Sequence, residues 1–101
     1  MSKTRVLYVE DEEVLAMLVR DHLERNGFEV HWVANGNEAE AIFREVKPDL
    51  CILDIMLPGL SGYEIGKVIR TIDKAVPIIF LTARSESKDV VEGFKSGGND
   101  Y

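Results

Sequence analysis

The chain has 101 residues, of which 46% are hydrophobic and 30% charged, and it carries a formal net charge of −6. This composition is typical of one soluble globular domain and excludes a disordered tail, and no apolar run approaches the roughly 18 residues of a membrane span. The acidic balance, without a cluster of Lys and Arg, argues against direct binding of nucleic acid by this segment.

The hydrophobic pattern predicts strands and helices in strict alternation. In chain order, the expected strands are residues 5–9, 28–33, 50–53 and 77–82, and the expected helices lie within residues 15–23, 35–46, 61–72 and 87–96. Asn26–Gly27 closes the first helix, and Ser61 with Glu64 has the spacing of a capping box. Strand and helix alternating in this way indicate parallel strands joined by right-handed helical crossovers, hence an open α/β sheet.

Polar residues follow three of the four expected strands. Glu10 and Asp11 come after the first strand, Asp54 after the third and Thr82 at the end of the fourth. Parallel strands place their carboxyl ends at one edge of the sheet, and ligands of such sheets bind where the strand order reverses. We therefore expect a polar crevice at that edge.

Asp54 is the strongest candidate for a reactive residue. It ends the uncharged run of residues 50–53, and a carboxylate at the end of a buried strand is costly unless it lies in an open crevice with a cation or hydrogen-bond donors. Glu12 and Glu13 have a simpler explanation, because acids in the first turn of a helix complement its dipole. No helix dipole requires Asp54, which precedes a turn.

The acids also predict a metal site. If the first and third strands are neighbours, Asp11 and Asp54 converge, and carboxylates so close cannot all remain ionised without a cation. Hard oxygen ligands in a small, partly hydrated site favour Mg²⁺. The carbonyl of Met56 is the expected backbone ligand.

Three motifs together resemble the receiver domain of two-component response regulators. They are the acidic pair Glu10–Asp11, Asp54 within Leu-Asp-Ile-Met-Leu-Pro-Gly-Leu-Ser-Gly, and Leu81-Thr82-Ala83, which occur in the order and at the spacing of that family. The resemblance runs from about residue 5 to the last residue. It implies a flavodoxin-like (CheY-like) fold, an open doubly wound parallel sheet in the strand order 2-1-3-4.

The resemblance also implies the roles of the site residues. Asp54 would accept a phosphoryl group from a phosphohistidine on a histidine kinase or phosphotransfer protein, while Asp11, Asp54 and the Met56 carbonyl would bind Mg²⁺. Glu10 would act on the metal through water. The module would be a signalling switch and not an enzyme, beyond catalysing its own phosphorylation and dephosphorylation.

The switch that the resemblance implies lies in the last fifth of the chain. Thr82 would reorient to hydrogen-bond the phosphoryl oxygen, and Tyr101 matches the aromatic residue that then turns inward. The two negative charges of a phosphoryl group at the crevice would bias residues 82–94 between two states and so control a downstream output. An output domain that binds DNA would fit this family.

The family pattern continues beyond the last residue. Its invariant Lys, fifth strand and fifth helix would all follow Tyr101, so we expect residues 1–101 to form a receiver domain that is incomplete at its C-terminus. The fourth strand would then be an unpaired edge, through which a homodimer could form.

Three alternatives remain open on the residues alone. A receiver-like module could bind partners without being phosphorylated. A Mg²⁺-dependent phosphatase of the haloacid dehalogenase kind would need a second acid at position 56, where Met stands. A nucleotide- or flavin-binding module would need a phosphate cradle after the first strand, and the acids there repel phosphate.

Other residue types that often carry chemistry have simpler interpretations. His22 and His31 lack a second ligand nearby in the sequence, and Trp32 in a strand favours a packing role. Cys51 has no intrachain partner and fits a buried small hydrophobic residue. Residues 1–5 lead straight into the first strand without the apolar region of a signal peptide, so we expect a cytoplasmic location without membrane contact.

Overall fold

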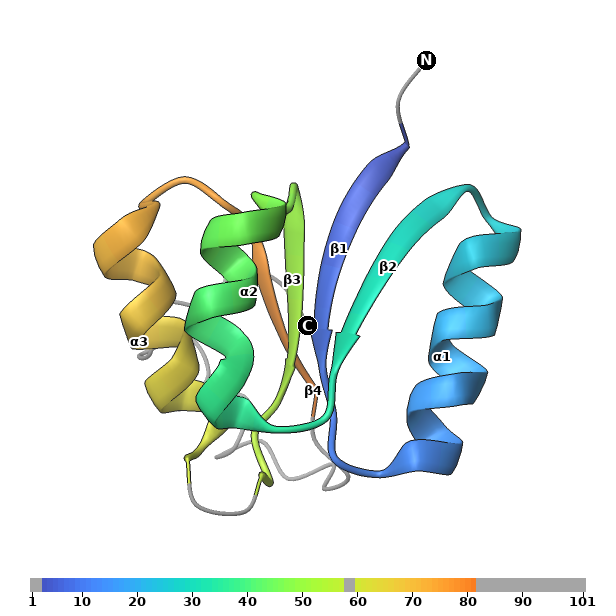
Figure 1. Ribbon diagram of the computed structural model, residues 1–101, viewed down its shortest axis with the longest axis horizontal. Coiled ribbons are helices and arrows are strands. Elements are labelled where there is room, and N and C mark those ends of the chain that lie inside the picture. Colours follow the sequence, from blue (N-terminus) through green and yellow to red (C-terminus); the bar gives the residue numbers. More distant parts are fainter. Residues whose placement is uncertain (1–2, 58–59, 82–101) are drawn as a thin grey trace.

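The computed structural model describes residues 3–57 and 60–81. Thr82, Tyr101 and the helix expected within residues 87–96 lie outside these described residues. The elements in chain order are β1 (Thr4–Val9), α1 (Glu13–Arg25), β2 (Phe28–Val33), the 3₁₀ turn η1 (Gly36–Glu38), α2 (Ala39–Val46), β3 (Leu50–Asp54), α3 (Gly62–Ile72) and β4 (Ile78–Leu81) (Figure 1).

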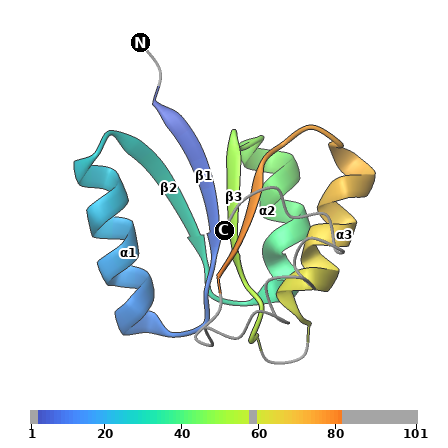
Figure 2. The same ribbon diagram turned by 180° about the vertical axis from the view of Figure 1, so that it is seen from behind.

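The four described strands form one parallel sheet in the order β2-β1-β3-β4, which confirms the expected fold and strand order. Helix α1 covers one face of the sheet, while α2 and α3 cover the other (Figures 1 and 2). The chain moves from β1 outward to β2 and then crosses back to β3, so the strand order reverses between β1 and β3. Both strands are central in the described sheet, and their carboxyl ends share one edge.

Each face of the sheet buries its own hydrophobic cluster, because successive side chains of a strand point to opposite faces. Leu7 and Leu53 pack with α2 and α3, whereas Tyr8 and Ile52 lie in the cluster that also holds Ala16 of α1. The two central strands are therefore covered on both sides. Their rigid packing fixes where residues 10, 11 and 54 emerge.

Two helices differ in detail from the sequence expectation. The second helix begins at Ala39 and not at Asn35, because a 3₁₀ turn precedes it and Asn35 Oδ1 accepts a hydrogen bond from Asn37 N at 2.9 Å within that turn. In α1, Leu15 and Leu18 have the helical spacing of core residues, yet they are 41% and 65% exposed. Ala16, one residue from Leu15, is the α1 residue that is fully buried.

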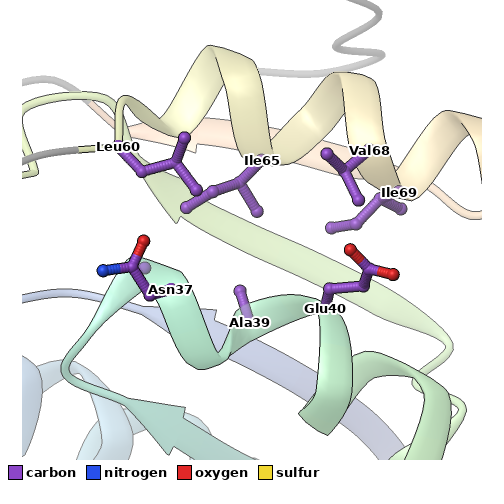
Figure 3. A pocket seen from close by; sticks show the side chains of 8 residues that line it. Asn37, Ala39, Glu40, Leu60, Ile65, Val68 and Ile69 are labelled. Atoms are coloured by element: carbon purple, nitrogen blue, oxygen red, sulfur yellow. The ribbon is translucent and has the colours of Figure 1, made fainter.

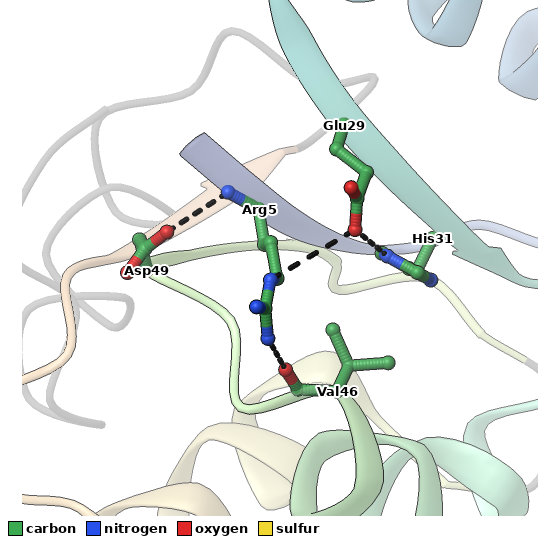
Figure 4. A network of polar contacts seen from close by, with 5 residues as sticks. All are labelled: Arg5, Glu29, His31, Val46 and Asp49. Atoms are coloured by element: carbon green, nitrogen blue, oxygen red, sulfur yellow. Dashed lines mark hydrogen bonds and ion pairs between the residues drawn. The ribbon is translucent and has the colours of Figure 1, made fainter. Parts of the chain in front are cut away.

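The amino end of the sheet, opposite the acids, is held by polar contacts around Arg5 (Figure 4). Asp49 Oδ2 accepts from the Arg5 backbone N at 2.9 Å, and the Val46 carbonyl accepts from the Arg5 guanidinium at 2.8 Å. Glu29 accepts from His31 Nε2 at 2.7 Å and lies 3.9 Å from Arg5 Nε. These contacts join β1 to β2 and to the α2–β3 connection.

No helix within residues 3–57 and 60–81 is both long and apolar enough to cross a membrane.

Candidate functional site

Three carboxylates gather at the carboxyl ends of β1 and β3. Val9, the last residue of β1, pairs with Leu53, so Glu10 and Asp11 continue past the strand beside Asp54. One oxygen from each of the three side chains lies within 4.8 Å of the others. The parallel register therefore brings together acids that are more than forty positions apart in the sequence.

The three acids differ in their exposure to solvent. Glu10 is 1% exposed and Asp54 8%, whereas Asp11 is exposed. Burial raises the pKa of Glu10 to about 7, and a hydrogen bond to Asp54 adds to the effect because only the protonated form of Glu10 can donate it. The ionised form of Glu10 is thus disfavoured without a positive charge nearby, and the exposed Asp11 provides a ligand at the solvent side.

The backbone around Asp54 orients its carboxylate. Met56 N donates to Asp54 Oδ1 at 3.0 Å, and Ile55 N donates to the Leu81 carbonyl at 3.1 Å, which continues the ladder between β3 and β4. Met56 itself is 53% exposed, whereas Asp54 is 8% exposed. One Asp54 oxygen is therefore held in place by the backbone of the turn that follows β3.

The acids open into a cleft at this edge of the sheet. It is lined by Glu10, Asp11, Glu12, Leu15, Val19, Asp54, Met56 and Leu81. Leu81 pairs directly with Asp54 across the sheet, so the chain leaves β4 beside the acid cluster. Thr82 is the next residue, and it lies outside the described residues, as does Tyr101.

Helix α3 begins against the backbone of Asp54. Ser61 Oγ caps the helix by accepting from Tyr63 N at 3.0 Å. A Cβ atom on Gly62 would overlap the Asp54 carbonyl and come within 2.9 Å of the Ile55 Cα. Only glycine allows this approach, so Gly62 lets α3 press against the end of β3.

A second, smaller hollow lies between α2 and α3 (Figure 3). Leu60, Ile65, Val68 and Ile69 line it with apolar atoms, and Asn37 and Glu40 contribute its polar atoms. It contains no cluster of acids, and the chemistry therefore points to the cleft around Asp54.

The sequence model of the family described as "Response regulator receiver domain" matches residues 6–101. The chain belongs to this family. The match covers both acidic motifs and all of the described sheet except Thr4 and Arg5 of β1, and it confirms the resemblance noted in the sequence.

Relatives of this receiver domain include response regulators from several bacteria. The phosphate regulon transcriptional regulatory protein PhoB of Rhizobium meliloti is 46% identical over 96% of this chain and 44% of its own length. The DNA-binding response regulator MtrA of Mycobacterium tuberculosis is 40% identical over 98% of this chain and 43% of its own length. The receiver chain thus spans less than half the length of these relatives.

Solved receiver structures share the fold of this chain. The chemotaxis protein CheY4 of Vibrio cholerae has a TM-score of 0.92 with 30% identity, over 98% of this chain and 84% of that one. A putative response regulator from Chloroflexus aurantiacus has a TM-score of 0.93 with 34% identity, over 100% of this chain and 84% of that one.

The acid cluster of this receiver fits a divalent metal ion, of the kind that receiver domains typically bind. Its oxygen donors are hard ligands, two of the three acids are buried, and burial followed by the neighbouring Asp54 raises the pKa of Glu10, so a nearby cation would favour its ionised form. Donor chemistry and electrostatics agree on this point.

Two residues that touch the site were missed in the sequence. Tyr8 Oη donates to Glu10 Oε1 at 3.3 Å, and Trp32 Nε1 donates to the Glu10 carbonyl at 2.8 Å. The two-residue spacing of Tyr8 and Glu10 was a usable signal, because Glu10 directly follows β1 and residues two apart along an extended backbone share a face. The contact of Trp32 depends on how β2 pairs with β1, which no local pattern shows.

Proposed function

We propose that this receiver domain accepts a phosphoryl group on Asp54 from a phosphohistidine of a histidine kinase or phosphotransfer protein. An Asp54 carboxylate oxygen attacks the phosphorus, the new O–P bond forms as the N–P bond breaks, and the imidazole leaves and takes up a proton. The observation that carries the proposal is the placement of Asp54, buried to 8% exposure, beside Glu10 and Asp11 at the open end of the sheet.

We propose Mg²⁺ as the cofactor, held by Asp11, Asp54 and the Met56 carbonyl. Bound there, Mg²⁺ would supply positive charge that offsets the charge of the incoming phosphoryl group. Asp11 is exposed and can approach a cation directly. Both Glu10 oxygens already accept hydrogen bonds from the protein, from Tyr8 and from Glu12 N, and we assign Glu10 a contact with the metal through a water molecule.

The output lies beyond the acid cluster. Leu81 pairs with Asp54, and Thr82 is the next residue in the sequence; we assign Thr82 and Tyr101 the roles of phosphoryl hydrogen bond and aromatic switch. Residues 82–94 would transmit the change. Because MtrA is named a DNA-binding response regulator, a DNA-binding domain in the whole protein, acting in the cytoplasm, is the output we propose.

The test uses a small phosphoryl donor. The chain is incubated with acetyl phosphate and Mg²⁺, and intact-mass spectrometry measures the addition of one phosphoryl group. The addition should disappear in Asp54→Ala and in the presence of EDTA. Asp49→Ala, at the opposite end of the sheet, is the matched control and should be phosphorylated like the unmodified chain. Unchanged labelling of Asp54→Ala, or none in the unmodified chain, would overturn the proposal.

A further inference from the structure

Every polar atom of Glu10 is engaged by the protein. Its backbone N donates to the Val33 carbonyl at 3.0 Å, and its carbonyl accepts from Trp32 Nε1 at 2.8 Å. Its carboxylate oxygens accept from Tyr8 Oη at 3.3 Å and from Glu12 N at 3.2 Å. A Glu side chain normally has several rotatable bonds free, and here both ends of the residue are fixed.

Tyr8 holds the carboxylate from within the core. It lies on β1 and is fully buried, with its ring in the cluster on the α1 face of the sheet. Burial, and then the neighbouring charge of Glu10, raise the pKa of its hydroxyl. From this buried position Tyr8 donates its hydroxyl hydrogen to Glu10 Oε1.

Trp32 holds the backbone from the neighbouring strand. It pairs with Tyr8 in the β1–β2 register, so the two side chains lie on one face of the sheet. The Arg20 guanidinium of α1 lies 5.8 Å from the centroid of the indole ring. The half-buried indole is thus placed between α1 and β1, with its N–H reaching the Glu10 carbonyl.

We propose that Tyr8 and Trp32 are positioning residues that fix the Glu10 carboxylate toward Asp54 before a cation arrives. The inference rests on the proposed metal site, and it adds two residues that act on Glu10 and do not bind the metal themselves. Groups that hydrogen-bond a metal-site carboxylate raise affinity because they remove the cost of ordering it during binding. The loss of one such hydrogen bond weakens Mg²⁺ binding about three- to tenfold.

The experiment is a double-mutant cycle on Mg²⁺ affinity, measured by isothermal titration calorimetry. Tyr8→Phe and Trp32→Phe are prepared with Glu10 present and again with Glu10→Ala. Each should weaken Mg²⁺ binding about three- to tenfold with Glu10 present and have no effect when Glu10 is absent. A purely structural role would change the free energy of unfolding without this dependence on Glu10.

Tyr63→Phe is the matched control. It removes a phenol hydroxyl from α3, where the centroid of the Tyr63 ring lies 5.1 Å from that of the Phe80 ring. This change should leave the Mg²⁺ affinity unchanged. Unfolding in EDTA checks that each variant folds, and Tyr8→Phe, which keeps the ring, decides the question if Trp32→Phe does not fold.

The outcomes separate the two proposals. No saturable Mg²⁺ binding by the unmodified chain overturns the proposed metal site. Saturable binding with unchanged affinity in both variants overturns only the positioning role. An equal loss with and without the Glu10 side chain also overturns it, because the residues would then act by another route.

Discussion

Replacing Glu10 by Gln should stabilise the metal-free protein at high pH. Glu10 is 1% exposed, and burial followed by its hydrogen bond with Asp54 raises its pKa from 4.5 to about 7. The folded state therefore favours the protonated carboxyl of Glu10. The free energy of unfolding that this preference contributes is fully present below the unfolded-state pKa of 4.5, and it is lost as the pH rises through about 7. At roughly 1.4 kcal/mol per pH unit, the loss reaches about 3 kcal/mol.

Gln matches the shape of the protonated acid but cannot ionise. Its carbonyl oxygen can accept from Tyr8 or Glu12 N, and its amide can donate to Asp54. The two proteins should therefore have similar unfolding free energies near about pH 5, while Glu10→Gln should be more stable by about 2 to 3 kcal/mol near about pH 8.

Urea unfolding in EDTA across this pH range measures the difference. Glu24→Gln, on the exposed surface of α1, is the matched control and should not gain this stability near about pH 8. A constant gap between Glu10→Gln and the unmodified chain, or a lower stability of Glu10→Gln near about pH 8, would refute the electrostatic reasoning.

Three further predictions concern other parts of the described structure. Gly62→Ala should lower the unfolding free energy by about 1–3 kcal/mol and slow phosphorylation by acetyl phosphate, because the new Cβ atom would overlap the Asp54 carbonyl. An unchanged phosphorylation rate and stability would show that α3 can move away from Asp54 at no cost. Burial raises the pKa of the Cys51 thiol to about 12, so iodoacetamide should label Cys51 only in urea, and rapid labelling of the folded chain would contradict its burial. Asp49→Ala removes the acceptor of the Arg5 backbone N and should lower the free energy of unfolding in urea by about 0.5–1.5 kcal/mol. Its Mg²⁺ affinity should be unchanged, because Asp49 lies at the other end of the sheet from the acids. Weaker Mg²⁺ binding would argue against that separation.

The alternation of apolar runs and amphipathic segments was sufficient to predict an open parallel α/β sheet, whereas the strand order 2-1-3-4 came from the resemblance to receiver domains. Four strands separated by helices admit few arrangements once the crossovers are right-handed, and they force the residues after each strand to one edge. The proximity of Asp11 and Asp54 could be predicted for this reason, although their separation in sequence is large. It required only that β1 and β3 be neighbours, as they are.

The parts that the sequence could not show are contacts between elements. Trp32 reaches Glu10 only because of the residue-by-residue register between β1 and β2, and one step of slippage would turn it to the other face. The need for glycine at position 62 comes from the approach of α3 to Asp54, which depends on the path of the intervening turn. Helical periodicity likewise put Leu18 and Val19 on the same buried face of α1. In the structure Val19 packs against the core, but Leu18 is 65% exposed.

Glu10 has opposite effects on the stability of the metal-free protein and on the proposed metal binding. The position is fully enclosed by Tyr8, Trp32 and backbone donors, so an ionised carboxylate there destabilises the metal-free fold. The same enclosure holds the charge ready for a cation, and binding then recovers the free energy that burial costs. Glu10→Gln should accordingly gain stability in EDTA and lose Mg²⁺ affinity in the same protein. If Glu10→Gln gained stability and bound Mg²⁺ as tightly as the unmodified chain, the buried charge would not contribute to binding. The stability lost by burying an ionised Glu10 would then need another explanation.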